Sequence, residues 1–131
     1  MTQFTTDHIF NIGTQHLRGG KPCEDYAFSG NLGDAAYAIV SDGCSCGDKT
    51  DIGARLICLS TAQVIEDVWS QSRDIDVRDQ VMKRQTILFA SAASHFGLTI
   101  RDMLATSVYA VLSESGAIAH VCGDGVIATS A

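Results

Sequence analysis

The sequence predicts an α+β fold in which stacked antiparallel sheets are faced by helices. Two adjacent helical patterns, at about residues 51–71 and 77–95, lie between two regions of short apolar runs broken by turn residues. The runs at 35–40 and 105–112 are apolar or small at nearly every position. Strands that are apolar on both faces must be covered on both faces. This order of elements favours antiparallel hairpins over a parallel Rossmann sheet.

Length and charge limit the classes of function. The chain has 131 residues, 46% of them hydrophobic, which is enough for one compact domain over residues 1–131. The formal net charge is −6 and the basic residues are scattered. Nucleic-acid-binding domains usually carry a basic stripe, and anionic membranes attract basic segments. We therefore expect no nucleic acid and no membrane as partners, whereas an acidic excess suits a site that holds cations.

The cysteines and the N-terminus indicate a compartment. No basic start followed by an apolar run is present, and the apolar runs are too short to span a bilayer. The five cysteines are odd in number and lack the spacing of a secreted disulfide framework. We therefore expect a reducing, cytoplasmic setting, with Cys58 and Cys122 as small core residues.

The two helical segments have recognisable ends. Thr50 or Asp51 can cap the first helix. The second starts at an Asp76 cap, with Asp79 in its first turn, and Gly97 stops it.

A hairpin before the helices brings carboxylates together. The runs 23–28 and 35–40 predict two antiparallel strands that turn near Gly33. In this hairpin Asp25 and Asp42 arrive at the same end of neighbouring strands. Adjacent strands lie ~5 Å apart, so carboxylates from both strands can share one cation site.

The last third of the chain reads as further strands. The runs 105–112 and 117–122 flank a turn at 113–116 and predict a second hairpin. Weaker patterns predict strands at 4–13 and 126–129.

The strongest signal for a site is Asp42-Gly43, directly after a buried run. A carboxylate at the end of such a strand has a rigid support, and glycine allows close approach of the backbone to a ligand. Magnesium and manganese prefer oxygen ligands, and one carboxylate can bridge two such ions. Asp-Gly is also a common turn dipeptide, so spacing alone leaves a plain turn open.

Two other acidic segments can contribute to the same site. In a strand Glu24 and Asp25 point to opposite faces, so only one faces a shared site and the other can hold water there. Asp124, between two glycines, can place an acid at a sheet edge. The alternatives are an ordinary exposed acidic pair and a β-turn without function.

Cys44 and Cys46 leave a thiol site open as a further alternative. A lone C-x-C without a second pair is weak evidence for zinc, and no histidine is placed by the sequence to activate Cys44 as a nucleophile. A calcium loop over 42–53 is disfavoured, because Cys44, Cys46 and Gly53 occupy positions that need oxygen ligands.

Taken together, six segments resemble a known family. Their order and spacing are similar to those of the metal-dependent serine/threonine protein phosphatases of type 2C (PPM type). The likeness is greatest to a bacterial branch in which G-x-x-H and G-x-P-C-[QE]-D open the domain. The segments are 13–16, 20–25, 38–43, 51–54, 105–107 and 121–125.

The resemblance implies an α-β-β-α sandwich of two antiparallel sheets flanked by helices, with a binuclear Mg²⁺ or Mn²⁺ centre between the sheets. It implies that Asp42 bridges the two ions and that the carbonyl of Gly43 binds one. Asp25, with Glu24, would bind a metal directly or through water. Asp124 matches a position that joins an additional, weaker metal site. Asp42 and Asp25 would thus be the catalytic residues.

The activity implied by the resemblance is hydrolysis of phosphoserine and phosphothreonine in proteins by a water that bridges the metals, without a covalent phosphoenzyme. The partners would be a phosphorylated protein substrate and a cognate serine/threonine kinase system. The alternative is a non-catalytic phosphatase-like binding or regulatory module that lacks a complete metal site.

The chain departs from the family pattern at two positions. Many members bind phosphate with an arginine where this chain has Gly20, so Lys21, Arg18 or His16 would have to bind phosphate instead. Some members carry a histidine after Asp-Gly, where this chain has Cys44.

The resemblance also implies later strands that supply further aspartates, and no aspartate follows Asp124 here. We therefore expect this chain to be the N-terminal portion of the domain, with a fold incomplete at the C-terminus. Such a portion should bind metal weakly and show little or no turnover.

Overall fold

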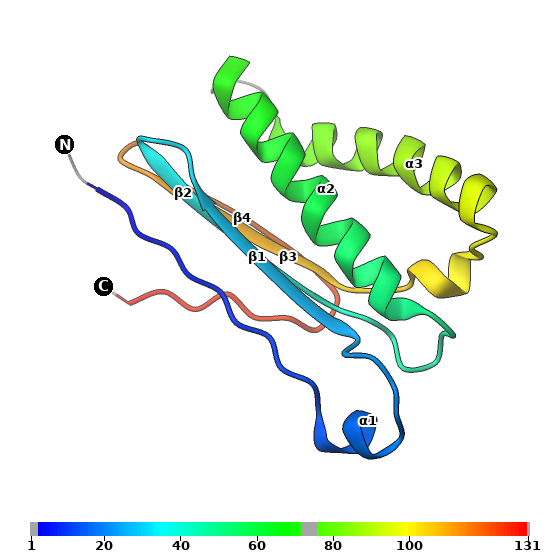
Figure 1. Cartoon of the computed structure of the whole chain (residues 1–131). Helices are drawn as coiled ribbons and strands as arrows, with labels where there is room; N and C mark the ends of the chain where they lie inside the picture. The colour runs from blue at the N-terminus through cyan, green and yellow to red at the C-terminus, as the bar shows by residue number, and fades with distance from the viewer. Residues whose placement is uncertain (1–2, 72–75, 131) are drawn as a thin grey trace.

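A computed structural model of the protein describes residues 3–71 and 76–130 (Figure 1). Within these residues four strands form one antiparallel sheet in the order β1-β2-β3-β4, and helices pack on one of its faces. This confirms the α+β class with an antiparallel sheet faced by helices. In chain order the elements are α1 (Thr14–Arg18), β1 (Asp25–Asn31), β2 (Ala35–Asp42), α2 (Thr50–Gln71), α3 (Val77–Phe96), the 3₁₀ helix η1 (Ile100–Met103), β3 (Ser107–Ser113) and β4 (Gly116–Cys122).

The two long helices confirm the predicted segments to within one residue. The side chain of Asp76 accepts a hydrogen bond from the N–H of Asp79 at 3.2 Å, which is the expected N-cap of α3. Gly97 ends α3 with φ 63°, a left-handed conformation that glycine adopts without strain. The expected cap of α2 was wrong, because Thr50 and Asp51 already belong to its first turn.

The first hairpin places the two acidic positions side by side. Gly33 has φ 84° in the turn between β1 and β2, where a residue with a side chain would be strained. The register that follows pairs Asp25 with Asp42. The prediction that both carboxylates come to the same end of neighbouring strands is therefore confirmed.

The core lies between the sheet and α2. Side chains alternate along a strand, so Tyr37 and Ile39 of β2 and Tyr109 of β3 project toward the helices, where all three are buried. They meet Ile65 and Val68 of α2, which are equally buried. Since α2 also packs against β1 and α3, it holds the helical layer onto the sheet.

The opposite face of the sheet keeps apolar side chains accessible. Val40, Leu112 and Val121 are 47, 49 and 46% exposed. A two-sheet sandwich would cover this face, and the described residues form one of its sheets and the helices on one side. Segments near both chain ends run beyond this face in Figure 1 without joining a sheet.

The predicted strands at 4–13 and 126–129 were therefore wrong for the described residues. Neither segment pairs with a strand. The N-terminal segment instead contacts β1 through side chains, with Phe10 stacked near Tyr26 at a ring distance of 4.9 Å. Both segments had weak alternation, and a strand needs a hydrogen-bonding neighbour as well as an extended backbone.

The structure corrects two expectations about the cysteines. Cys58 is buried as predicted, but Cys122 is exposed because β4 is an edge strand and the helices do not cover it. Cys44 and Cys46 are joined by a disulfide, which the expected reducing setting did not include. No helix in the described part of the chain has both the length and the apolar character needed to cross a membrane.

Substitution of Gly53 by alanine should destabilise the fold. A Cβ there would lie 2.7 Å from the Cα of Met103 and 2.9 Å from the carbonyl oxygen of Asp102. These are backbone atoms, so α2 and η1 would have to separate. We expect Gly53→Ala to lower the free energy of unfolding by about 1–3 kcal/mol in urea titrations, although alanine normally favours a helix by about 1 kcal/mol.

Gly13→Ala is the matched control, because no atom lies within 4 Å of its Cβ position and φ is −67°. Its stability should change by less than about 0.5 kcal/mol. Equal stabilities of the two variants would contradict the close packing of α2 on η1.

Candidate active site

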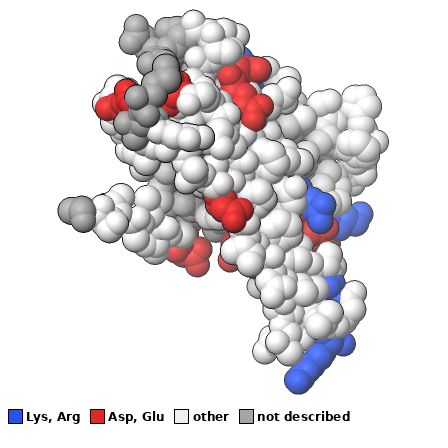
Figure 2. Space-filling model, turned by 60° about the vertical axis from the view of Figure 1, so that its left-hand side comes forward, with Lys and Arg blue, Asp and Glu red and all other residues white. Residues whose placement is uncertain are grey.

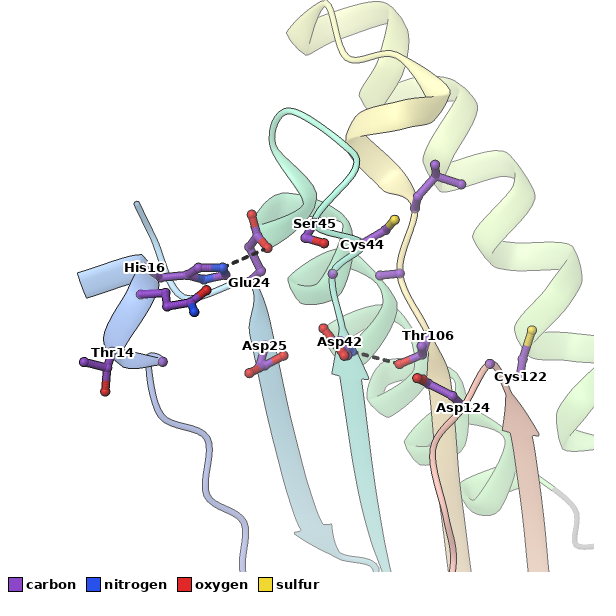
Figure 3. A pocket seen from close by; sticks show the side chains of 16 residues that line it. Thr14, His16, Glu24, Asp25, Asp42, Cys44, Ser45, Thr106, Cys122 and Asp124 are labelled. Atoms are coloured by element: carbon purple, nitrogen blue, oxygen red, sulfur yellow. Dashed lines mark hydrogen bonds and ion pairs between the residues drawn. The ribbon is translucent and has the colours of Figure 1, made fainter. Parts of the chain in front are cut away.

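A cavity of about 810 Å³ opens at the end of the sheet where Asp25 and Asp42 pair. Among the residues that the structure describes, four carboxylates line it and no lysine or arginine does. Figure 3 shows that its walls come from α1, the ends of β1 and β2, the segment before β3 and the segment after β4. The lining residues are Gly13, Thr14, Gln15, His16, Glu24, Asp25, Asp42, Gly43, Cys44, Ser45, Leu104, Ala105, Thr106, Cys122, Gly123 and Asp124.

The carboxylates of Asp25 and Asp42 form the centre of this cavity. They face each other across the gap between β1 and β2 (Figure 3). Partial burial raises the pKa of Asp42, and a hydrogen bond and charge repulsion from Asp25 raise it further. The charges of Asp124 and Glu24 act in the same direction. The cavity therefore concentrates negative charge, and the basic side chain in its described lining is that of His16.

Thr106, in the segment before β3, holds the backbone of Asp42 in place. Its hydroxyl accepts a hydrogen bond from the N–H of Asp42 at 2.8 Å, and its own N–H donates to the carbonyl of Asp42 at 2.8 Å. The hydroxyl of Ser41 also donates to the carbonyl of Thr106 at 2.5 Å. Because the N–H and the carbonyl of Asp42 are both hydrogen-bonded, the backbone that carries its carboxylate is held in position at the end of β2.

Glycine is required at position 43 by the protein backbone itself. A Cβ there would lie 2.7 Å from the carbonyl oxygen of Thr50 and 2.8 Å from that of Glu24. The N–H of Gly43 also donates to the carbonyl of Glu24 at 3.0 Å. Sequence reasoning attributed this glycine to the approach of a ligand, whereas the structure shows that it lets β1, β2 and the start of α2 meet.

Glu24 lies in the cavity together with Asp25. Glu24 precedes the first residue of β1, so the alternation of a strand does not send it to the other face. Its carboxylate Oε2 lies 3.6 Å from Nε2 of His16 on α1. Asp124 reaches the cavity from the segment after β4 (Figure 3). The structure thus brings together all four acidic residues that the sequence singled out.

Comparison with known families identifies the fold. A family model described as Protein phosphatase 2C matches residues 12–131. The chain belongs to the protein phosphatase 2C family. Neither the curated proteins nor the solved structures contain a significant match. Family membership indicates phosphatase function in general, and the matched range includes every residue of the acidic cavity.

The three candidate phosphate-binding residues of this phosphatase occupy different places. His16 lines the cavity, half-buried against Glu24. Arg18 and Lys21 are exposed and lie outside the cavity lining. On the face shown in Figure 2, basic side chains gather at the end of the molecule where α1 lies. Of the three candidates, His16 is thus the one that the structure places in the cavity lining.

The acidic residues offer the oxygen ligands that magnesium and manganese prefer, but too few of them lie close together to form a complete ligand set. Carboxylate oxygens are the ligands these ions prefer. Asp25 and Asp42 provide two facing carboxylates. Within residues 3–71 and 76–130, however, no three histidine, cysteine or acidic side chains are close enough to hold a metal ion. Asp25 and Asp42 are therefore the pair that would hold a cation.

Sequence reasoning missed the parts of the site that support the acids. Thr106 belongs to the segment 105–107 that contributed to the resemblance, but no role was assigned to it. The helix α1, which presents His16 to Glu24, was also missed because five residues carry too little periodicity.

Replacement of Asp42 by asparagine should stabilise the metal-free protein at pH 7. The pKa of Asp42 is higher in the folded than in the unfolded state, so its ionised form opposes folding above that pKa. We expect Asp42→Asn to raise the free energy of unfolding by roughly 0.5–1 kcal/mol, a small value because the side chain is largely exposed. The gain should vanish as the pH falls through the folded pKa, where wild-type Asp42 is protonated.

Urea titrations in the presence of a chelator at pH 7 and at acidic pH measure this effect. Asp48→Asn is the control, because Asp48 is exposed and outside the cavity lining. A destabilised, metal-free Asp42→Asn protein at pH 7 would show that the cavity does not hold repelling charges.

Proposed function

We propose that the acidic cavity hydrolyses phosphoserine and phosphothreonine in proteins with Mg²⁺ or Mn²⁺. The proposal rests on the facing carboxylates of Asp25 and Asp42, in a cavity whose described lining holds four acids and neither lysine nor arginine. A phosphate dianion would be repelled by such a cavity. Bound dications reverse the sign of the local field, so a phosphatase built on these residues has to be metal-dependent.

Each group of the chain has a distinct part in this proposal. Asp42 and Asp25 would hold the cations, and the carbonyl of Gly43 and the carboxylate of Asp124 would supply further oxygens. Thr106 fixes the backbone of Asp42 and hence the direction of its carboxylate. When bound, such dications activate water for attack at neutral pH and neutralise the phosphoryl oxygens.

The basic residues act at the substrate side of the cavity. His16, oriented by Glu24, faces the space in which the phosphoryl group would lie. Arg18, at the end of α1, and Lys21 are exposed and would attract a phosphorylated segment before it enters. A serine/threonine kinase must supply the substrate, because phosphoserine and phosphothreonine arise by phosphoryl transfer. The cytoplasmic location stays a prediction from the sequence.

One observation favours a second candidate, a phosphatase-like binding module without catalysis. The described residues hold no group of three metal-binding side chains. The pKa of Asp42 is also raised by burial and by the hydrogen bond to Asp25, so this pair can bind a proton where a phosphatase binds a cation. The two candidates differ in whether Mn²⁺ displaces that proton.

Titration calorimetry with Mn²⁺, together with phosphate release from a phosphothreonine peptide, tests the proposal. We expect weak Mn²⁺ binding by the wild-type chain and slow, Mn²⁺-dependent phosphate release. Asp42→Asn should lower this release by about 100-fold or more, because one cation loses its anchoring carboxylate. Asp48→Asn should retain both properties.

Absence of both Mn²⁺ binding and phosphate release would favour the binding module. Equal phosphate release by wild type and Asp42→Asn would contradict the assigned role of the carboxylate pair.

A further inference from the structure

The disulfide between Cys44 and Cys46 is part of the loop that follows the candidate metal ligands. The two Cα atoms lie 5.3 Å apart, and only Ser45 separates the residues. Cys44 is half-buried and lines the cavity, whereas Cys46 is exposed. The bond is therefore accessible from solvent at the edge of the acidic cavity.

This disulfide is poorly suited to stabilise the fold. A disulfide stabilises mainly by restricting the unfolded chain, and the effect grows with the length of the closed loop. A bond across a single intervening residue closes one of the shortest loops possible. The disulfide between Cys44 and Cys46 therefore contributes little to the stability of the whole fold.

The loop closed by the disulfide is coupled to Asp42 through the backbone. The N–H of Cys44 donates to the carbonyl of Leu104 at 2.9 Å, and the N–H of Gly47 donates to the carbonyl of Cys44 at 3.0 Å. Leu104 lies two residues before Thr106, which binds both backbone groups of Asp42. A movement of the Cys44 backbone can therefore be transmitted to Asp42 through residues 104–106.

A side chain of η1 also holds the loop. The guanidinium of Arg101 donates a hydrogen bond to the carbonyl of Cys46 at 2.9 Å. This contact joins the exposed end of the disulfide loop to η1, which precedes the segment that contacts Asp42. The free cysteine Cys58, by contrast, is buried, and burial raises its pKa to about 12, so it takes no part in exchange.

We propose that Cys44–Cys46 is a reversible thiol–disulfide exchange site for a small dithiol, and that its reduction loosens the loop after Asp42. A thiolate of the dithiol attacks the exposed Sγ of Cys46 and expels the thiolate of Cys44, which takes up a proton. The second thiol of the reagent then attacks its own mixed-disulfide sulfur and releases Cys46. The protein gains two electrons and two protons, and the dithiol becomes a cyclic disulfide.

Alkylation of the native protein with and without dithiothreitol, read by mass spectrometry, tests the exchange step. Without dithiothreitol only Cys23 and Cys122 should be alkylated, because Cys58 is buried and Cys44 and Cys46 are bonded. Dithiothreitol should add Cys44 and Cys46 without unfolding, and oxidised dithiothreitol should protect them again. Alkylation of Cys44 and Cys46 without reductant, or only in urea, would overturn the proposal.

Hydrogen exchange tests the coupling to the loop. On reduction the amides of Cys44 and Gly47 should exchange roughly tenfold faster, since a short closed loop is released. The amide of Tyr109 in the centre of the sheet should not change. A Cys44→Ser, Cys46→Ser double variant should exchange like the reduced protein and ignore dithiothreitol.

Identical exchange of these amides in both redox states would overturn the coupling. Both measurements are made without metal or phosphopeptide. Their outcome is therefore independent of whether the proposed phosphatase activity is found.

Discussion

The pairing of Asp25 with Asp42 across β1 and β2 is the constraint on which the site depends. The side chains of a strand alternate, so a slip of one residue would move one carboxylate to the opposite face of the sheet. The short turn at Gly33 sets this register, and Tyr37 and Ile39, buried under α2, prevent it from slipping. The acidic cavity is thus a consequence of the same pattern that builds the core.

The helical segment between β2 and β3 supplies the contact that holds the central acid of the site. After β2 the chain forms α2, α3 and η1 before β3 returns beside β2. This return brings Thr106 against Asp42, so a residue distant in sequence fixes the backbone of the central acid. The close approach of Gly53 to η1 sets where β3 can start, which links helix packing to the geometry of the cavity.

The site places four acidic side chains around one cavity. Burial, the hydrogen bond to Asp25 and the charges of the neighbouring acids all raise the pKa of Asp42, so its ionised form is disfavoured there. Positions where a sequence violates local physical rules are commonly functional. The disulfide between Cys44 and Cys46 borders the same cavity, and Cys44 is only two residues from Asp42 in the chain.

The sequence alone determined the long helices, the hairpins and the meeting of Asp25 with Asp42, because periodicity, caps and turn glycines act locally. It failed at the weakly patterned segments 4–13 and 126–129, since pairing requires a partner strand that the local sequence does not reveal. Only the tertiary structure decided that Glu24 shares the cavity, that Thr106 anchors Asp42 and that Cys122 stays exposed. These features depend on which distant segments become neighbours, and that is set by packing of the whole core rather than by any single stretch of chain.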